Sequence, residues 1–191
     1  YLLTQGIDRL NGKGFLEFSP DIIGTSILFG PSYDNVLDIL RISREIFPNA
    51  MLLAGGGIAT TTYTQMFDDS PELDAIGFTE CEIPMLELLK AKDKKSHIEK
   101  DRSWISRTKK NLPRSAFEAK YIWNLDEIPF YDYGIVNKDD YSLNPALTAY
   151  AGVYDSSNNY HYMTSRGCPY RCNFCASHKV NGREMRYHSI K

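Results

Sequence analysis

Short apolar runs alternate with segments of helical periodicity through the first ninety residues of the chain. One almost continuous apolar run, rich in β-branched residues, occupies residues 21–29, and a second occupies residues 50–54. Strands that alternate with helices pair in parallel and are covered on both faces. The pattern therefore predicts an α/β fold with a Rossmann-like parallel sheet, whose strand at residues 21–29 is buried on both faces. Between the two runs, apolar residues recur at the three- and four-residue steps of a helix: Val36, Ile39, Leu40, Ile46 and Phe47. The alternation continues with a helix at 61–67, a strand at 74–78 and a helix at 83–91.

A glycine triplet, Gly55, Gly56 and Gly57, follows the second apolar run directly. In parallel sheets, ligands bind beyond the carboxyl ends of the strands, where glycine lets the backbone approach a ligand closely. The spacing is not the G-x-G-x-x-G fingerprint of dinucleotide-binding proteins, so a nicotinamide or flavin site has little support. The triplet indicates either a ligand-binding loop or a tight turn without a ligand.

Three of the four cysteines, Cys168, Cys172 and Cys175, stand close together with the spacing C-x3-C-x2-C. Three thiolates on one loop can hold three irons of a cubane cluster and leave the fourth iron open to a reactant. A zinc site with His178 as fourth ligand is an alternative, but structural zinc ligands usually come as two separated pairs. A disulfide framework would leave one odd thiol. The remaining Cys81 is isolated, so the spacing favours an iron–sulfur cluster.

The cysteine run, Thr-Ser-Arg-Gly-Cys-Pro-Tyr-Arg-Cys-Asn-Phe-Cys-Ala-Ser at residues 164–177, resembles the cluster loop of radical S-adenosylmethionine enzymes. That loop has the same spacing and usually an aromatic residue before its third cysteine, the place of Phe174. The resemblance implies a 4Fe-4S cluster on the three cysteines and S-adenosylmethionine at the open iron, with Phe174 near its adenine. It also implies that a deoxyadenosyl radical forms and removes a hydrogen from the substrate. Residues 160–165 would be the first strand of the radical SAM (β/α) partial barrel.

The first ninety residues resemble the cobalamin-binding domain that precedes the barrel in one class of these enzymes. The resemblance rests on the order of Ser26-Ile-Leu28, then Gly55 and Gly56, then an acidic turn with Glu80 and Glu82. It implies that Ser26, Gly55 and Gly56 line the pocket for the nucleotide tail of cobalamin, with Leu28 and Gly57 as neighbours. In the acidic turn, Thr79 and Cys81 replace the glycines of the family's Gly-Glu-Gly-Glu pattern.

The Asp-x-His-x-x-Gly motif of cobalamin domains that ligate cobalt through histidine is absent. It either lies upstream of Tyr1, or the cofactor is bound without a protein imidazole. Each histidine of the chain is expected to be a surface or packing residue: His97, His161, His178 and His188.

The chain is expected to be an excerpt of a longer protein, with three parts. Residues 1–91 would form the cobalamin-binding-like Rossmann domain without its N-terminal part, residues 92–150 a connector, and residues 151–191 the truncated start of the radical SAM barrel. The densely charged residues 90–102 are expected to be a solvated turn or linker. The aromatic residues 121–133 are interleaved with acids rather than with Lys or Arg, which favours packing between domains over nucleic-acid binding. They also resemble the Leu-Asp-Glu-Ile-Pro connector of the same enzymes.

Composition excludes several partners. The net charge is −2, from 22 basic and 24 acidic residues, so the chain has no overall electrostatic attraction to nucleic acid or to an anionic membrane surface. Binding of either would need a local basic patch. No apolar stretch approaches the length of a membrane span and no signal peptide is visible. With its free thiols, the chain is expected in the cytoplasm.

Together these features predict a cobalamin-dependent radical SAM enzyme that acts as a methyltransferase or a cyclase. The alternatives are a radical SAM enzyme without cobalamin and a non-catalytic zinc-binding protein. The expected partners are a small-molecule substrate and an electron donor such as flavodoxin or ferredoxin. No catalytic residue is assigned beyond the cluster ligands, and none of the residues in the family's Gly-Arg-x-x-Arg-Tyr pattern receives a catalytic role: Arg183, Arg186 and Tyr187.

Overall fold

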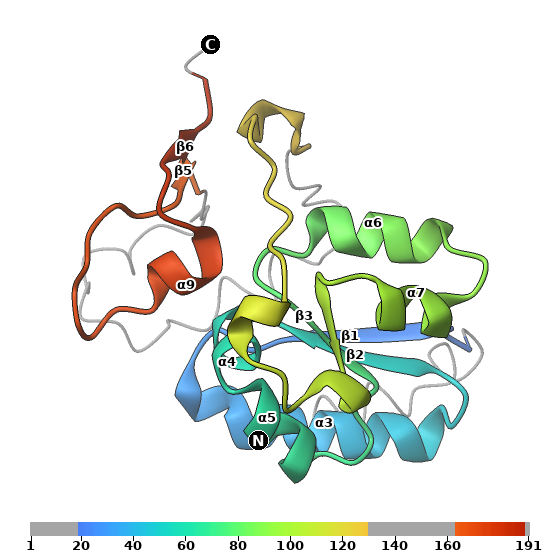
Figure 1. Ribbon diagram of the computed structural model, residues 1–191. Coiled ribbons are helices and arrows are strands. Elements are labelled where there is room, and N and C mark those ends of the chain that lie inside the picture. The colour runs from blue at the N-terminus through green and yellow to red at the C-terminus, as the bar shows by residue number, and fades with distance from the viewer. Residues whose placement is uncertain (1–18, 130–162, 190–191) are drawn as a thin grey trace, which may run out of the picture.

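A four-stranded sheet forms the centre of the computed structural model, which describes residues 19–129 and 163–189. The strands lie in the order β1 (Ile22–Ser26), β2 (Met51–Gly55), β3 (Ala75–Gly77) and β4 (Trp104–Ser106). β1, β2 and β3 pair in parallel, and β4 pairs with β3 antiparallel. The Rossmann-like α/β fold predicted from the sequence is confirmed (Figure 1).

Helices cover both faces of this sheet. α3 (Tyr33–Ile46) connects β1 to β2, and α4 (Gly56–Thr61) with α5 (Tyr63–Asp69) connects β2 to β3. α6 (Glu82–Lys90) and α7 (Lys94–Lys100) follow β3 and lie on the face opposite α3 and α5 (Figure 1). Short 3-10 helices complete this part of the chain: η1 (Gly30–Ser32), η2 (Arg107–Lys109), η3 (Arg114–Ala116) and η4 (Leu125–Glu127).

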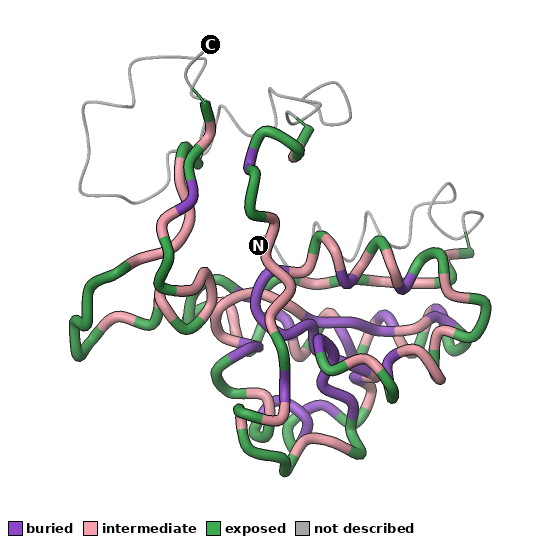
Figure 2. Tube along the Cα trace, turned by 45° about the horizontal axis from the view of Figure 1, so that its top comes forward, coloured by how far each residue is buried: buried purple, intermediate pink, exposed green. Residues whose placement is uncertain are grey.

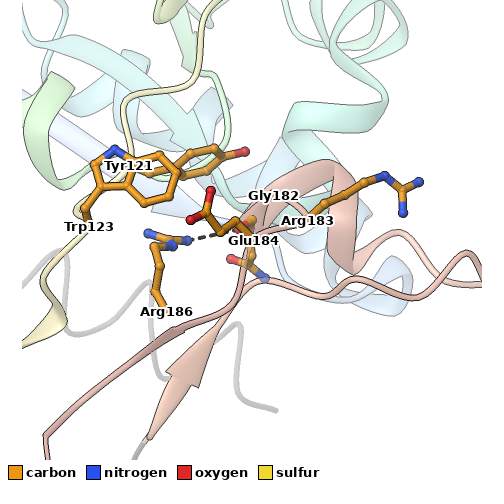
Figure 3. A pocket seen from close by; sticks show the side chains of 7 residues that line it. Tyr121, Trp123, Gly182, Arg183, Glu184 and Arg186 are labelled. Atoms are coloured by element: carbon orange, nitrogen blue, oxygen red, sulfur yellow. Dashed lines mark hydrogen bonds between the residues drawn. The ribbon is translucent and has the colours of Figure 1, made fainter.

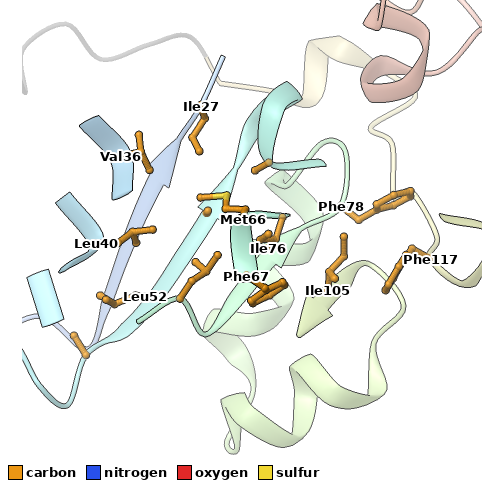
Figure 4. Close-up of a cluster of buried hydrophobic side chains, with 14 of the residues drawn as sticks. Ile27, Val36, Leu40, Leu52, Met66, Phe67, Ile76, Phe78, Ile105 and Phe117 are labelled. Atoms are coloured by element: carbon orange, nitrogen blue, oxygen red, sulfur yellow. The ribbon is translucent and has the colours of Figure 1, made fainter. Parts of the chain in front are cut away.

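The strands divide their side chains between two cores, because successive residues of a strand point to opposite faces. In β2, Leu52 and Ala54 join the larger core under α3 and α5, whereas Leu53 joins the smaller core under α6 and α7. In β4, Ile105 joins the larger core and Trp104 joins the smaller core. Figure 4 shows the larger core, to which α5 contributes Met66 and Phe67.

Two local expectations differ from the structure. β1 is not buried on both faces, since Gly24 and Ser26 are exposed, and among the described residues β1 pairs only with β2. The charged residues 90–102 are not simply a solvated linker, because they contain α7, which is capped by Asp93 and buries Ile98. A single buried apolar residue on a lysine-rich helix gives almost no periodic signal.

The sheet also continues past residue 91, where the sequence analysis placed the end of the first domain, because β4 pairs with β3.

A second, smaller unit contains the three clustered cysteines. We call residues 163–189 the cysteine segment. β5 (Ser165–Arg166) and β6 (Arg186–Tyr187) pair antiparallel at its base, and α9 (Ser177–Asn181) lies between them in sequence. Most of the segment is exposed or half-buried, in contrast to the sheet (Figure 2). Residues 160–162 of the expected barrel strand lie outside the described residues, so the start of a barrel stays a prediction.

Gly56 is the point where β2 turns into α4, and only glycine suits its position. Its φ is +90°, and a Cβ there would lie 2.6 Å from the carbonyl oxygen of Ile27. The backbone around it is closely bonded, since Ile27 N donates to Gly55 O at 2.9 Å and Ile58 N donates to Ile27 O at 3.2 Å. The glycine loop, residues 55–57, is therefore locked against the end of β1.

We expect Gly56→Ala to lower the free energy of unfolding of the chain by about 2 kcal/mol or more, because it adds left-handed strain and a backbone clash. Gly24→Ala is the matched control, since a Cβ there meets nothing within 4 Å. That control should change stability by no more than about 0.5 kcal/mol. Urea denaturation of the two variants measures both values, and equal stabilities would contradict the structure of the loop.

Candidate functional site

The carboxyl ends of the parallel strands gather three of the loops that the sequence singled out. Ser26 at the end of β1 pairs directly with Gly55 at the end of β2. The acidic turn, residues 79–82, follows β3, and the Cys81 sulfur would lie 3.8 Å from a Cβ on Gly55. The sheet therefore brings the serine, the glycine loop and the acidic turn to one edge, where such folds bind ligands.

Solvent reaches part of this edge. Ser26 is exposed, and Leu28 and Phe29 just beyond β1 are each 65% exposed. Apolar side chains this exposed are accessible to a ligand. The binding roles of the residues expected to line a cobalamin pocket stay predictions.

The cysteine segment lies beside the glycine loop. α9 packs against α4, and a Cβ on Gly57 would lie 3.6 Å from Val180 Cγ2. Arg114 bridges the same two helices, since its Nη1 donates to Thr60 O at 3.2 Å and its Nη2 donates to Lys179 O. Residues more than a hundred positions apart in sequence are therefore neighbours here (Figure 1).

The cysteine loop is open toward solvent. Cys168 N donates to Gly182 O at 3.0 Å, which fixes the start of the loop, and Cys172 is exposed. Phe174 is 93% exposed. Its contact with the adenine of S-adenosylmethionine stays a prediction. Cys172 and Cys175 line a cavity of about 360 Å³ together with His178 and basic side chains: Arg171, Lys179 and Arg183.

Among the described residues, one group of possible ligands is already close enough for a single metal ion. Donor atoms of Glu87, His97 and Asp101 all lie within 4.8 Å of one another. Lys120 Nζ lies 2.6 Å from Glu87 Oε2 and 2.8 Å from Asp101 Oδ2. Burial opposes the ionisation of Asp101, but hydrogen bonds from Lys120 and Ser103 outweigh it and lower the pKa of that carboxyl. The ammonium group already supplies the positive charge, so this is an ion-pair cluster.

The donor atoms of Cys168, Cys172, Cys175 and His178 do not form such a close group in the described chain. A structural zinc ion needs four ligands around one point, whereas a cubane takes each thiolate at a different iron. The cluster on these three thiols therefore stays a prediction.

Two of the described histidines lie beside carboxylates. His97 Nε2 is 3.4 Å from Asp101 Oδ2, and His188 Nδ1 is 3.5 Å from Asp126 Oδ1. Desolvation, followed by the positive charges of Arg183, Lys179 and Arg114, lowers the pKa of His178. His161 lies outside the described residues.

Sequence reasoning missed what the acidic turn contacts. Glu80 and Glu82 were placed only by their resemblance to a family pattern, and Arg186 was given no role. In the structure, both acids pair with arginines of the cysteine segment, Arg166 and Arg186. A contact between residues 80 and 186 leaves no periodic trace, so only the complementary charges could have suggested it.

Cys81 lies in the acidic turn, outside the run of clustered cysteines. Burial, followed by the charges of Glu82 and Glu80, raises the pKa of the Cys81 thiol to about 12. A thiol with this pKa is almost wholly protonated at neutral pH, and the thiolate is the form that binds metal and reacts with electrophiles. Cys81 is therefore not a candidate cluster ligand.

We expect iodoacetamide at pH 8 to alkylate the exposed Cys172 of the reduced chain at least about ten times faster than Cys81. Mass spectrometry of digested samples measures the two rates. In denaturant, where the environment of Cys81 is lost, the two rates should converge. Equal rates in the native chain would contradict the described position of Cys81.

No solved structure gives a significant match to the chain. The B12 binding domain family matches residues 14–89. An uncharacterized methyltransferase of Pyrococcus horikoshii is 30% identical over 175 residues, which are 92% of this chain and 35% of the relative. A cytidylyl-2-hydroxyethylphosphonate methyltransferase of Streptomyces wedmorensis is 26% identical over 94% of this chain and 37% of the relative.

An anaerobic magnesium-protoporphyrin IX monomethyl ester cyclase of Cereibacter sphaeroides is 30% identical over 85% of this chain and 25% of the relative. The chain thus spans 25–37% of the length of these three relatives. The comparisons confirm the B12-binding domain that the sequence motifs indicated, and they support the resemblance to radical S-adenosylmethionine enzymes that carry such a domain.

Proposed function

We propose that this chain is part of a cobalamin-dependent radical S-adenosylmethionine enzyme that transfers a methyl group or closes a ring on a small-molecule substrate. The relatives that match most of the chain are methyltransferases and a cyclase, which supports this class of enzyme. The proposal includes a reducing, cytoplasmic setting and a protein electron donor such as a flavodoxin or ferredoxin. Among the described residues, none of the helices has both the length and the hydropathy needed to cross a bilayer.

The residues divide into two sets under this proposal. Cys168, Cys172 and Cys175 would hold the 4Fe-4S cluster, with Phe174 beside S-adenosylmethionine. When bound, the cluster and S-adenosylmethionine supply a deoxyadenosyl radical, and cobalamin supplies a transferable methyl group. The set at the sheet edge would bind cobalamin: Ser26, Gly55 and Gly56, with Leu28 and Gly57 as neighbours.

One observation carries the proposal most directly: α9, at the end of the cysteine loop, packs on α4, which begins in the glycine loop. The contact between Val180 and the position of Gly57 puts the two candidate cofactor sites on adjoining elements. A reaction that uses both cofactors on one substrate requires them to be close together.

The same contact also supports a second candidate, a radical SAM enzyme in which the first domain is a docking module without cobalamin. In that case α9 would cover the glycine loop in place of a cofactor. Retention of cobalamin separates the two candidates. After incubation with hydroxocobalamin and gel filtration, the full-length protein should keep about one cobalamin per chain if the first proposal holds, and none if the second holds.

We expect Cys172→Ser in the anaerobically reconstituted full-length protein to lose most of its iron and sulfide and to abolish cleavage of S-adenosylmethionine. Cys81→Ser is the matched control, because it removes a thiol that lies outside the cysteine loop. That control should keep its iron, its sulfide and its cleavage within about twofold of the wild-type protein. Cleavage that persists in Cys172→Ser, or zinc without sulfide in the wild-type protein, would contradict the proposal.

A further inference from the structure

Glu80 is a buried carboxylate in a strained turn. It is 7% exposed, and it follows Thr79, which has a φ of +70°. A β-branched residue in this left-handed region is unusual, and the strain persists only where the surrounding structure holds it. Here Thr79 N donates to Thr60 Oγ1 at 3.1 Å. The turn therefore holds Glu80 toward the interior, where a carboxylate is costly unless it is paired.

The partners of Glu80 come from the cysteine segment. Arg186 Nη2 donates to Glu80 Oε1 at 2.5 Å, and Arg186 Nη1 donates to Glu80 Oε2 at 2.9 Å. Arg186 is itself 4% exposed, so both charges of this two-pronged pair are removed from water. Arg166 Nη1 lies 3.1 Å from Glu80 Oε2 and 2.7 Å from the more exposed Glu82 Oε1. Two arginines of one segment thus converge on one buried acid.

Arg186 also contacts the connecting residues and the end of α9. It donates to Ile122 O at 2.8 Å and to Asn181 O at 3.0 Å. Its guanidinium carbon lies 4.7 Å from the ring centre of Tyr121 and 5.8 Å from that of Trp123 (Figure 3). One planar side chain therefore joins the acidic turn, residues 121–123 and the cysteine segment.

Arg166 and Arg186 lie at the base of the cysteine loop. They face each other in the β5–β6 pair, and Cys168 follows Arg166 by two residues. A carboxylate that holds both arginines consequently fixes both ends of the loop that carries the three cysteines. Buried ion pairs add little to stability compared with apolar packing, but their geometry can specify one arrangement of two parts.

We propose that Glu80 is a positioning residue: through Arg166 and Arg186 it holds the base of the cysteine loop against the B12-binding domain and thereby sets the separation of the two cofactor sites. Its effect on the cysteine segment follows from the contacts alone. Its effect on the cofactors rests on the proposed function. Two measurements separate these parts.

The first measurement is hydrogen–deuterium exchange of the chain without cofactors. Glu80→Gln keeps the size of the side chain and removes its charge. Amides of the β5–β6 pair should then exchange at least about ten times faster than in the wild-type chain. The exchange rates of amides in β1 to β3 should stay within about twofold of the wild-type rates. Glu82→Gln is the matched control, because it makes the same change in the same turn at a carboxylate that is more exposed. It should leave all segments within about twofold. Arg186→Gln should raise the exchange of the same amides at least as much, because it also removes the bonds to Ile122 O and Asn181 O. The effect of the double variant should be smaller than the sum of the two single effects, because both variants break the same ion pair.

Equal exchange of the β5–β6 pair in Glu80→Gln and Glu82→Gln would overturn the positioning role. An equal loss of protection in β1 to β3 would also overturn it, because Glu80 would then only stabilise the fold.

The second measurement uses the full-length protein with reduced cluster and cob(II)alamin, whose dipolar coupling in pulsed electron paramagnetic resonance reports their separation. Glu80→Gln should broaden or shift that separation, and Glu82→Gln should not. An unchanged separation in Glu80→Gln would overturn the link to the cofactors. If the wild-type protein binds no sulfide, the proposed function is refuted. The hydrogen–deuterium exchange measurement then still tests whether Glu80 positions the cysteine segment.

Discussion

A carboxylate removed from water needs its countercharge, and Glu80 finds it in two arginines that lie 86 and 106 residues away. This requirement decides where the cysteine segment can lie. Most of that segment is exposed and it buries little apolar surface of its own, so apolar packing alone would not fix its position. The ion pairs, the stacking of Arg186 on Tyr121 and the contact of α9 with α4 act together to place it at the carboxyl edge of the sheet.

The parallel sheet brings the glycine loop and the acidic turn together. Because β1, β2 and β3 run in one direction, the loops that follow them meet at one edge. Gly56 lets the second loop approach the first so closely that no side chain could stand between them. The acidic turn follows β3 at the same edge, so the feature that creates the candidate cofactor site also presents Glu80 to its partners.

Features with a local period could be predicted from the sequence, and features that depend on distant partners could not. β2, β3 and α3 follow the apolar pattern closely, and Ser26 and Gly55 are neighbours because parallel pairing requires it. The exposure of Gly24 and Ser26 in β1 was missed, because an apolar run does not show whether both faces of the strand are covered. α7 was missed because its stability comes from one buried residue, Ile98, and from the cap of Asp93. The role of Arg186 depends on a charge in another part of the chain.

The central claim is that one protein holds a cluster on three cysteines beside a cobalamin at the glycine loop. A crystal structure of the full-length protein, reconstituted without oxygen with iron, sulfide and cobalamin, tests it most directly. The account predicts a 4Fe-4S cluster on Cys168, Cys172 and Cys175, and cobalamin against Ser26, Gly55 and Gly56. A zinc ion held by the three cysteines and His178, or a cobalamin bound elsewhere, would contradict it.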